Sequence, residues 1–341
     1  MDFIDRSLLN LVQTDFPIAT RPFLDLAEKV GVTEEEAFQR INALRENGII
    51  RRLGGVFDSH RLGYKSTLCA AKVPEDKIAL LRDTLMKIPG VTHNYLRNHQ
   101  YNVWFTLIAP SQAKVEKVLG QVRELIGRED VYSLPAIRVF KINVDFDFNL
   151  HESKVKDRGP SSKEVSSYPE KAPIGSFDIK PTPYPMEEKD KELVRGLQGD
   201  IPNSLTPFKE IAAQLGWQEE ELLEGTKNLI KNKVIRRFGA VLRHQKAGFT
   251  SNVMGVWQVP EEQIGEVGKI MATFREVSHC YQRPALVDWP YNLFTMIHGR
   301  SREECEETMA RIAQETGVKN YAMLFSLKEL KKTSMQYFME D

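Results

Sequence analysis

The chain has 341 residues, of which 28% are charged, and its 47 basic side chains balance its 47 acidic ones. A formal net charge of zero is not typical of a dedicated nucleic-acid-binding protein, although a local basic face could still bind DNA. No segment approaches the roughly 18 apolar residues that a membrane-spanning helix needs, and three widely spaced cysteines match neither a disulfide framework nor a zinc site. We therefore expect a cytoplasmic protein of about two to four globular domains.

The first fifty residues predict three short helices. Apolar residues recur at helical spacing over 2–14, so this segment is expected to be a helix of the fold and not a signal peptide. A second helix runs from Pro22 to a C-cap at Gly31. Thr33 begins a capping box for a third helix that ends near Gly48. The glycine turn between the second and third helices predicts a helix-turn-helix, with the Ile-Arg-Arg segment after it as the wing strand.

A small α+β domain is expected to follow the helices. The hydrophobic pattern changes between period 2 and period 3.6 along this stretch. The expected elements are a strand over 64–73, a helix over 75–88, strands over 91–97 and 102–109, a helix over 112–126 and a strand over 131–147. This βαββαβ order is the ferredoxin-like arrangement.

The second half of the chain repeats the first. Helices are again expected, over 188–197, 207–215 and 219–231. Four short motifs recur in the same order: Ile-Arg-Arg at 50–52 and 235–237, Val-Pro at 73–74 and 259–260, His-x-Tyr-x-Arg at 93–97 and 279–283, and Tyr-Asn at 101–102 and 291–292. The second copy carries about four extra residues before its Tyr-Asn pair. The chain is thus expected to be a tandem repeat of a winged helix-turn-helix plus a ferredoxin-like domain.

A polar segment rich in Pro, Ser and Lys separates the copies and cannot bury a core, so we expect it to be a tether. The expected division is a first helix-turn-helix domain at 1–55, a first ferredoxin-like domain at 56–150, the linker at 151–185, a second helix-turn-helix domain at 186–240 and a second ferredoxin-like domain at 241–341.

This architecture resembles the Lrp/AsnC transcriptional regulators, and sharper motifs resemble one branch, the sirohaem decarboxylases. These motifs are HCYQRP at 279–284 and WPYNLFTMIH at 289–298, with RRFGA at 236–240 and His244 upstream. The first copy, with HNYLR at 93–97, is similar to the companion subunit of that family. The resemblance implies loss of CO2 from two acetate side chains of sirohaem to give 12,18-didecarboxysirohaem, in haem d1 or alternative haem b biosynthesis.

The resemblance also implies an assembly, because Lrp/AsnC regulators pair through their ferredoxin-like sheets. An unpaired sheet edge would be a liability, so the two ferredoxin-like domains of this chain are expected to pair as an intramolecular pseudo-dimer. Further homo-oligomers are compatible with that arrangement.

The repeated His-x-Tyr-x-Arg motif suits a substrate that carries several carboxylates. Alternate residues of a strand share a face, arginine grips carboxylates, and histidine transfers protons near neutral pH. We assign catalysis to His279, His244 and Tyr281. Substrate binding is assigned to Arg283, Arg236, Arg237, Arg51, Arg52, His93, Tyr95, Arg97, Trp289 and Tyr291. No metal or organic cofactor is expected apart from the iron of the substrate, because zinc-type spacing and phosphate-binding glycine loops are missing from the sequence.

Two other functions remain open. One is DNA binding, but three glutamates begin each third helix, at 34–36 and 219–221, where carboxylates would repel phosphates. The other is a haem- or amino-acid-sensing module without catalysis. For the residues themselves, the arginine pairs could face solvent on the wings, and Trp289 could belong to the core.

Overall fold

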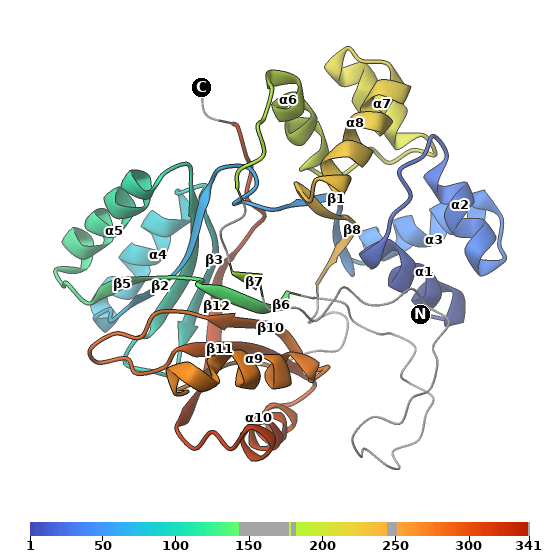
Figure 1. Cartoon of the computed structure of the whole chain (residues 1–341). Helices are drawn as coiled ribbons and strands as arrows, with labels where there is room; N and C mark the ends of the chain where they lie inside the picture. Colours follow the sequence, from blue (N-terminus) through green and yellow to red (C-terminus); the bar gives the residue numbers. More distant parts are fainter. Residues whose placement is uncertain (143–176, 179–181, 244–250, 340–341) are drawn as a thin grey trace.

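A computed structural model describes residues 1–142, 177–178, 182–243 and 251–339. The described strands form one two-stranded and one ten-stranded sheet. Two helix-turn-helix units lie on the small sheet, and the large sheet lies beside them with helices on its outer faces (Figure 1). Among the described residues no helix has the length and apolarity needed to cross a membrane.

The helix-turn-helix helices form where local sequence signals predict them. In the first copy they are α1 (Phe3–Thr14), α2 (Pro22–Val30) and α3 (Glu34–Glu46); in the second they are α6 (Glu188–Leu197), α7 (Pro207–Leu215) and α8 (Glu219–Lys231). Gly31 caps α2 at a φ of +75°, a left-handed conformation that favours glycine, and the Thr33 hydroxyl accepts the Glu36 N–H at the start of α3.

The strand after each set of helices does not fold back as a wing hairpin. Strand β1 (Ile50–Phe57) instead pairs antiparallel with β8 (Ile235–Leu242) of the other copy. Helix α1 packs on β8 and α6 packs on β1, so each copy completes the core of the other. Each copy also donates one backbone N–H across this junction, from Phe16 to the Phe238 carbonyl oxygen (3.0 Å) and from Ile201 to the Leu53 carbonyl oxygen (2.8 Å).

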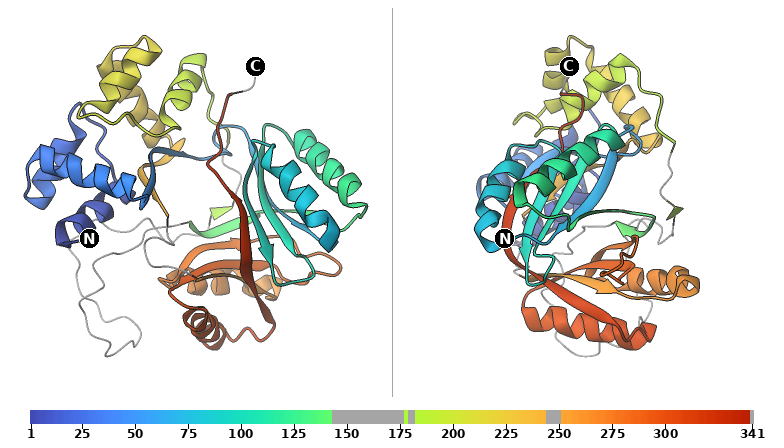
Figure 2. Two further views of the ribbon diagram at one scale, coloured as in Figure 1. Left: turned by 180° about the vertical axis from the view of Figure 1, so that it is seen from behind. Right: turned by 90° about the vertical axis from the view of Figure 1, so that its left-hand side faces the viewer.

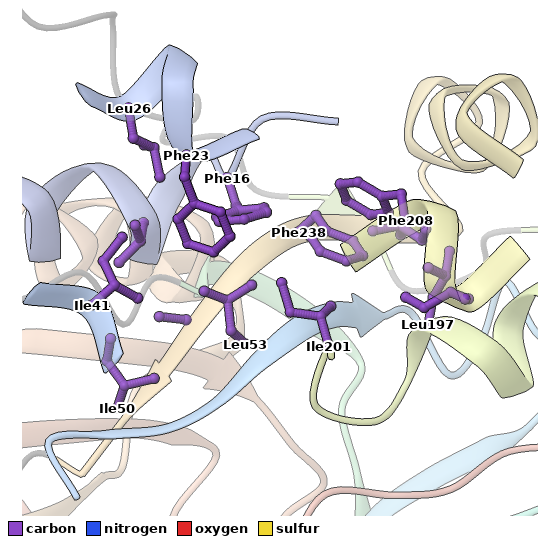
Figure 3. Close-up of a cluster of buried hydrophobic side chains, with 14 of the residues drawn as sticks. Phe16, Phe23, Leu26, Ile41, Ile50, Leu53, Leu197, Ile201, Phe208 and Phe238 are labelled. Carbon is purple, nitrogen blue, oxygen red and sulfur yellow. The ribbon is translucent and has the colours of Figure 1, made fainter. Parts of the chain in front are cut away.

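One hydrophobic core therefore spans both helix-turn-helix units (Figure 3). At its centre Phe16 of the first copy packs against Phe208 and Phe238 of the second, with ring centroids 6.3 and 6.2 Å away. All three side chains are at most 3% exposed. Separating the units would expose these rings, so burial of apolar area stabilises the pair as one body.

The ferredoxin-like elements follow the predicted order in both copies. The first copy contains β2 (Lys65–Ala71), the 3-10 turn η1 (Glu75–Lys77), α4 (Ile78–Met86), β3 (Val91–Arg97), β4 (Val103–Ala109), α5 (Gln112–Ile126), β5 (Val131–Pro135) and β6 (Arg138–Ile142). The second contains β9 (Ser251–Trp257), η2 (Glu261–Gln263), α9 (Ile264–Thr273), β10 (Val277–Gln282), β11 (Leu293–Gly299), α10 (Arg302–Thr316) and β12 (Tyr321–Lys332). The short β7 (Phe177–Asp178) lies inside the predicted linker and pairs with β6.

The last strand of each copy crosses into the other copy. The sheet order is β5-β2-β4-β3-β12-β9-β11-β10-β6-β7. Residues 321–325 of β12 pair with β9, and residues 326–332 pair with β3 of the first copy. The predicted strand over 131–147 is divided in the same way, because β5 pairs with β2 while β6 pairs with β10 of the second copy. The predicted pairing of the two ferredoxin-like domains is confirmed, and it occurs by strand exchange.

The two half-sheets enclose an aromatic core that includes Trp104, Trp289 and Phe294. Helices α4 and α5 cover the outer face of one half-sheet, and α9 and α10 cover that of the other (Figure 1). Beyond β12 the chain returns to the helix-turn-helix units, where Tyr337 joins their core (Figure 2). The last residues of the segment expected to be the second ferredoxin-like domain, 241–341, thus pack against the helix-turn-helix units.

Two recurring motifs of the sequence have a structural role. The side chain of Asn102 accepts the Val73 N–H (2.9 Å) and donates to the Val73 carbonyl (2.8 Å). Asn292 makes the same two bonds with Val259. The recurring Tyr-Asn and Val-Pro pairs are therefore the two sides of one loop connection that occurs in each copy.

Candidate active site

Both His-x-Tyr-x-Arg motifs place their three side chains on one face, as strand alternation predicted. On β10 the His279 and Tyr281 rings stack with centroids 5.9 Å apart, and the Arg283 guanidinium lies 4.8 Å from the Tyr281 ring. On β3 the corresponding distances are 6.5 Å between His93 and Tyr95 and 5.4 Å from Arg97 to Tyr95. We call His279, Tyr281 and Arg283 the His279 cluster, and His93, Tyr95 and Arg97 the His93 cluster.

Each motif arginine also binds the other copy, at the strand segment that precedes the exchange. Arg283 Nη1 donates to the Leu134 carbonyl of β5 at 2.5 Å, and Arg97 Nη1 donates to the Leu324 carbonyl of β12 at 2.7 Å. Burial lowers the pKa of both guanidinium groups to about 10, so both stay charged at neutral pH. Arg97 is only 4% exposed, which favours a structural role over its predicted contact with substrate. Arg283 is half-buried and retains exposed surface.

The helix-turn-helix layer adds one predicted arginine to each cluster. The positive charge of Arg236 on β8 lowers the pKa of both His279 and Tyr281, so this exposed side chain lies close to them. Arg51 on β1 interacts in the same way with Tyr95 and donates from Nη2 to Ser334 Oγ at 3.1 Å. The structure therefore brings these two predicted arginines to the two strand motifs.

His279 is held as a neutral imidazole. Burial, followed by the charges of Arg236, Arg283 and Lys141, lowers its pKa to about 4. An imidazole with this pKa is uncharged at neutral pH and can accept a proton or donate a hydrogen bond. Burial also raises the pKa of the Tyr281 hydroxyl above its usual value, so the phenol keeps its proton.

A hydroxyl behind His279 orients its ring, and sequence reasoning missed this contact. Ser278 Oγ lies 2.9 Å from His279 Nδ1 and 3.0 Å from His298 Nε2, and it donates to the Met296 carbonyl at 3.1 Å. In the first copy Thr92 Oγ1 lies 3.0 Å from His93 Nδ1, but Ile108 takes the place of His298. The sequence alone could have pointed to His298, because aligning the two copies after the insertion pairs it with Ile108, so that only the second copy has a histidine there.

The strands that face the two motifs differ in chemistry. Tyr281 and His279 are paired with Val139 and Ile142 on β6. Tyr95 and His93 are paired with Glu329 and Lys332 at the corresponding positions of β12. The Tyr95 hydroxyl donates to Glu329 Oε2 at 3.3 Å. The His279 cluster thus has an apolar neighbour strand, whereas the His93 cluster has a charged one.

Arg52 and Arg237, both predicted to bind substrate, bind helix ends instead. Arg52 Nη1 donates to the Gln198 carbonyl at the end of α6 (2.7 Å), and Arg237 Nη1 donates to the Gln13 carbonyl at the end of α1. A guanidinium at a helix C-terminus satisfies free carbonyls and complements the helix dipole. We correct their assignment to a structural role that holds the two helix-turn-helix units together.

Trp289 is likewise a core residue, not an exposed wall of a substrate site. Its side chain is 1% exposed and packs against Trp104 and Tyr101 of the first copy at 5.2 and 5.6 Å. The neighbouring Asp288 accepts from Lys72 (2.5 Å) and from the Tyr101 hydroxyl (2.7 Å). The insertion that distinguishes the second copy therefore holds the second ferredoxin-like domain against the first. The half-buried ring of Tyr291 packs against Trp289 at 5.0 Å.

His244 lies outside the described residues. The residue before it, Arg243, donates its N–H to the Ile49 carbonyl (2.9 Å), and its charge lowers the pKa of Arg51. Arg243 therefore belongs with the His93 cluster, not with His279. The first copy's His60 is within electrostatic range of Arg236, and its pKa is lowered by burial and, to a smaller extent, by the charges of Lys65 and Arg236.

Two observations bear on other functions. Among the described residues, no three His, Cys, Asp or Glu side chains converge as a metal site would require. Helices α3 and α8 both begin with three glutamates, as predicted. Glu34 is 4% exposed and forms an ion pair with Arg21, so it stabilises the helix start. Nothing in these helix starts favours contact with a phosphate backbone.

Comparisons with known proteins agree with this architecture. Residues 5–51 and 190–236 match a family model described as the siroheme decarboxylase NirDL-like HTH domain, and residues 61–141 and 246–331 match the AsnC-like ligand binding domain. A siroheme decarboxylase of Hydrogenobacter thermophilus is 39% identical over 336 residues, which cover 98% of this chain and 95% of that protein. A siroheme decarboxylase beta subunit of Methanosarcina barkeri is 48% identical over 44% of this chain and 99% of its own length.

A solved structure covers the whole architecture as well. The crystal structure of the siroheme decarboxylase NirDL, 34% identical, superposes with a TM-score of 0.73 over 98% of this chain and 94% of that one. A second crystal structure contains NirDL in complex with an iron-uroporphyrin III analogue, with a TM-score of 0.72. Likeness over nearly the full length, in both helix-turn-helix units and both ferredoxin-like domains, shows that the chain belongs to the sirohaem decarboxylase family of carboxy-lyases.

Proposed function

We propose that this chain removes CO2 from two acetate side chains of sirohaem, giving 12,18-didecarboxysirohaem, and that the His279 cluster is the reaction site. Such a product would serve haem d1 or alternative haem b biosynthesis. The observation that carries the proposal is the shared face of His279, Tyr281 and Arg283 on β10, beside the apolar positions of β6. This combination suits a flat macrocycle with acidic substituents. The complex of the similar NirDL with an iron-uroporphyrin III analogue supports the same class of ligand.

In this proposal the arginines anchor carboxylates that remain in the product. Arg236 reaches the cluster from β8, and the Arg283 side chain is fixed by its bond to the Leu134 carbonyl. A guanidinium held in one orientation loses little conformational freedom when it binds a carboxylate. The macrocycle would lie beside β6, where the half-buried Ile142 pairs with His279 and the buried Val139 pairs with Tyr281. These contacts would leave the reacting acetate near the imidazole.

Substrate binding would itself prepare His279 to donate a proton. The pKa of this histidine is lowered in part by Arg236 and Arg283. Substrate carboxylates that pair with these arginines would cancel that repulsion and raise the pKa of the imidazole. Binding and proton uptake would therefore be coupled. Ser278 Oγ lies close to Nδ1, which leaves Nε2 to face the substrate.

The chemical step needs one proton for each CO2. His279 protonates the macrocycle, the bond between the acetate methylene and its carboxylate breaks, and CO2 leaves while the electron pair moves into the ring. Protonation of the methylene carbon then gives the methyl group, and the ring loses the proton that it had gained. Because the ring accepts the electrons, we propose that the reaction needs no added metal, pyridoxal phosphate or reductant.

The repeat supplies a matched control for the test. Purified chain is incubated anaerobically with sirohaem after chelator treatment, and products are followed by mass spectrometry for two successive losses of CO2. His279→Ala is expected to lower turnover about 10²–10⁴-fold, the usual contribution of general acid–base catalysis. His93→Ala makes the same change on β3 and should have a much smaller effect.

Three results would count against the proposal. Equal loss of turnover in the two variants would contradict the assignment to the His279 cluster. A requirement for an added cofactor would contradict the proton-transfer mechanism. Binding of sirohaem without any loss of CO2 would instead support a sensing module.

A further inference from the structure

We propose that Glu329 and Lys332 prevent the His93 cluster from accepting a tetrapyrrole, so that each chain binds one substrate molecule despite its two motifs. This inference rests on the proposed function, because it takes a carboxylate-rich tetrapyrrole as the ligand. It concerns residues on β12 that belong to neither repeated motif.

Strand register makes the comparison between the clusters direct. Strand β6 and the second half of β12 occupy equivalent places. Each follows a leucine, Leu134 on β5 or Leu324 in the first half of β12, whose carbonyl accepts a bond from the motif arginine of the other copy. A lysine further along each strand, half-buried at Lys141 and buried at Lys331, also has the same role. Lys141 donates to the Phe274 carbonyl at the end of α9, and Lys331 donates to the Ile88 carbonyl at the end of α4.

Within this framework, which both copies share, the residues paired with the motif histidine and tyrosine are apolar on β6 and charged on β12. Val139, 1% exposed, pairs with Tyr281, whereas the exposed Glu329 pairs with Tyr95. One step along the same face, Lys332 takes the place of Ile142. Directly paired residues of antiparallel strands lie on one face, and the Tyr95–Glu329 hydrogen bond confirms this for Glu329.

The charged pair opposes binding in two ways. A macrocycle lying on β12 would have to remove Glu329 and Lys332 from water, and burying charges is costly even when they are paired. The Glu329 carboxylate also lies against the phenol of the motif, where it would repel the carboxylates of the ligand. Lys332 interacts with Glu329 and already has its pKa lowered by burial. Attraction between the cations of the His93 cluster and the ligand carboxylates therefore does not offset the cost of desolvating Glu329 and Lys332.

The test is a binding titration of the full chain with iron-uroporphyrin III, followed by absorbance and by native mass spectrometry. The wild-type chain is expected to bind one equivalent. Glu329→Val combined with Lys332→Ile gives β12 the residues of β6, and a second equivalent should bind with a Kd at least about tenfold lower than any second site of the wild type. The control is Lys328→Ile, which changes a charge on the same strand opposite Leu96 and should leave one equivalent.

The reciprocal change tests the same idea at the other cluster. Val139→Glu with Ile142→Lys should abolish the single equivalent, with near-ultraviolet circular dichroism used to verify that the variant is folded. A wild-type chain that binds two equivalents, or a Glu329→Val, Lys332→Ile chain that still binds one, would overturn the inference and leave the proposed function intact. A wild-type chain that binds none would instead contradict the proposed function.

Discussion

Acidification should destabilise this protein through His279. The folded-state pKa of His279 is about 4, while an unperturbed histidine has a pKa of about 6.5. Because the unfolded chain binds the proton more readily, the stability contributed by neutral His279 is complete above about pH 6.5 and is lost as the pH falls toward 4. Replacing His279 with Asn removes this titration and should flatten the pH dependence.

The size of the effect follows from the two pKa values. With 6.5 for the unfolded state and about 4 for the folded state, protonation of the unfolded chain costs about 2 kcal/mol of folding stability at pH 5 and almost nothing near pH 7.5. Occupation of the site by carboxylates should reduce this loss, because paired arginines no longer repel the imidazolium.

Chemical denaturation at the two pH values measures the prediction. Three of the tryptophans, Trp104, Trp257 and Trp289, are buried in the large sheet and its cores, so their fluorescence reports unfolding near the site. The stability difference between about pH 7.5 and 5 should be about 2 kcal/mol smaller in His279→Asn than in the wild type. A constant loss caused by the substitution cancels in this comparison. Parallel pH dependences of the two proteins would refute the neutral state assigned to His279.

Two further predictions test the packing of α1 on β8 and the orientation of the His279 ring. In Gly239→Ala the new Cβ would lie 2.4 Å from the Val12 carbonyl oxygen, so the stability measured in denaturant titrations should fall by about 2–4 kcal/mol. The control Gly120→Ala places its Cβ in open space and should be neutral or stabilising. His298→Ile gives the second copy the residue of the first and removes the contact with Ser278. It should lower kcat about tenfold and shift its pH profile while leaving the Kd for iron-uroporphyrin III unchanged, and a variant with an unaltered kcat and pH profile would exclude a positioning role.

Local signals in the sequence were sufficient for the elements and their order. Helix α2 lies between Pro22 and the left-handed Gly31, and these residues act on their own backbone whatever surrounds them. The alternation of His279, Tyr281 and Arg283 predicted one shared face, because a strand has only two faces. The repeat itself predicted that a corresponding group of side chains would occur in each copy.

Partners distant in the sequence were decided by tertiary structure. Arg52 and Arg237 follow the repeated motif as closely as Arg51 and Arg236 do, yet they point to helix ends of the other copy. Strand alternation separates neighbouring residues onto opposite faces but does not say which face meets the other layer. The strands predicted after the helices do form, but their partners were decided in the same way, since β1 and β8 pair across the copies.

The contrast between the clusters also depends on register. Sequence alone places Glu329 and Lys332 on a strand, and Val139 and Ile142 on another, without relating either pair to a motif. Only strand exchange sets Glu329 against Tyr95 and Val139 against Tyr281. The sequence therefore determined which side chains each cluster could use, through the two-residue period of a strand. Pairing between the copies decided their neighbours, because hydrogen bonds between strands depend on the packing of the whole chain.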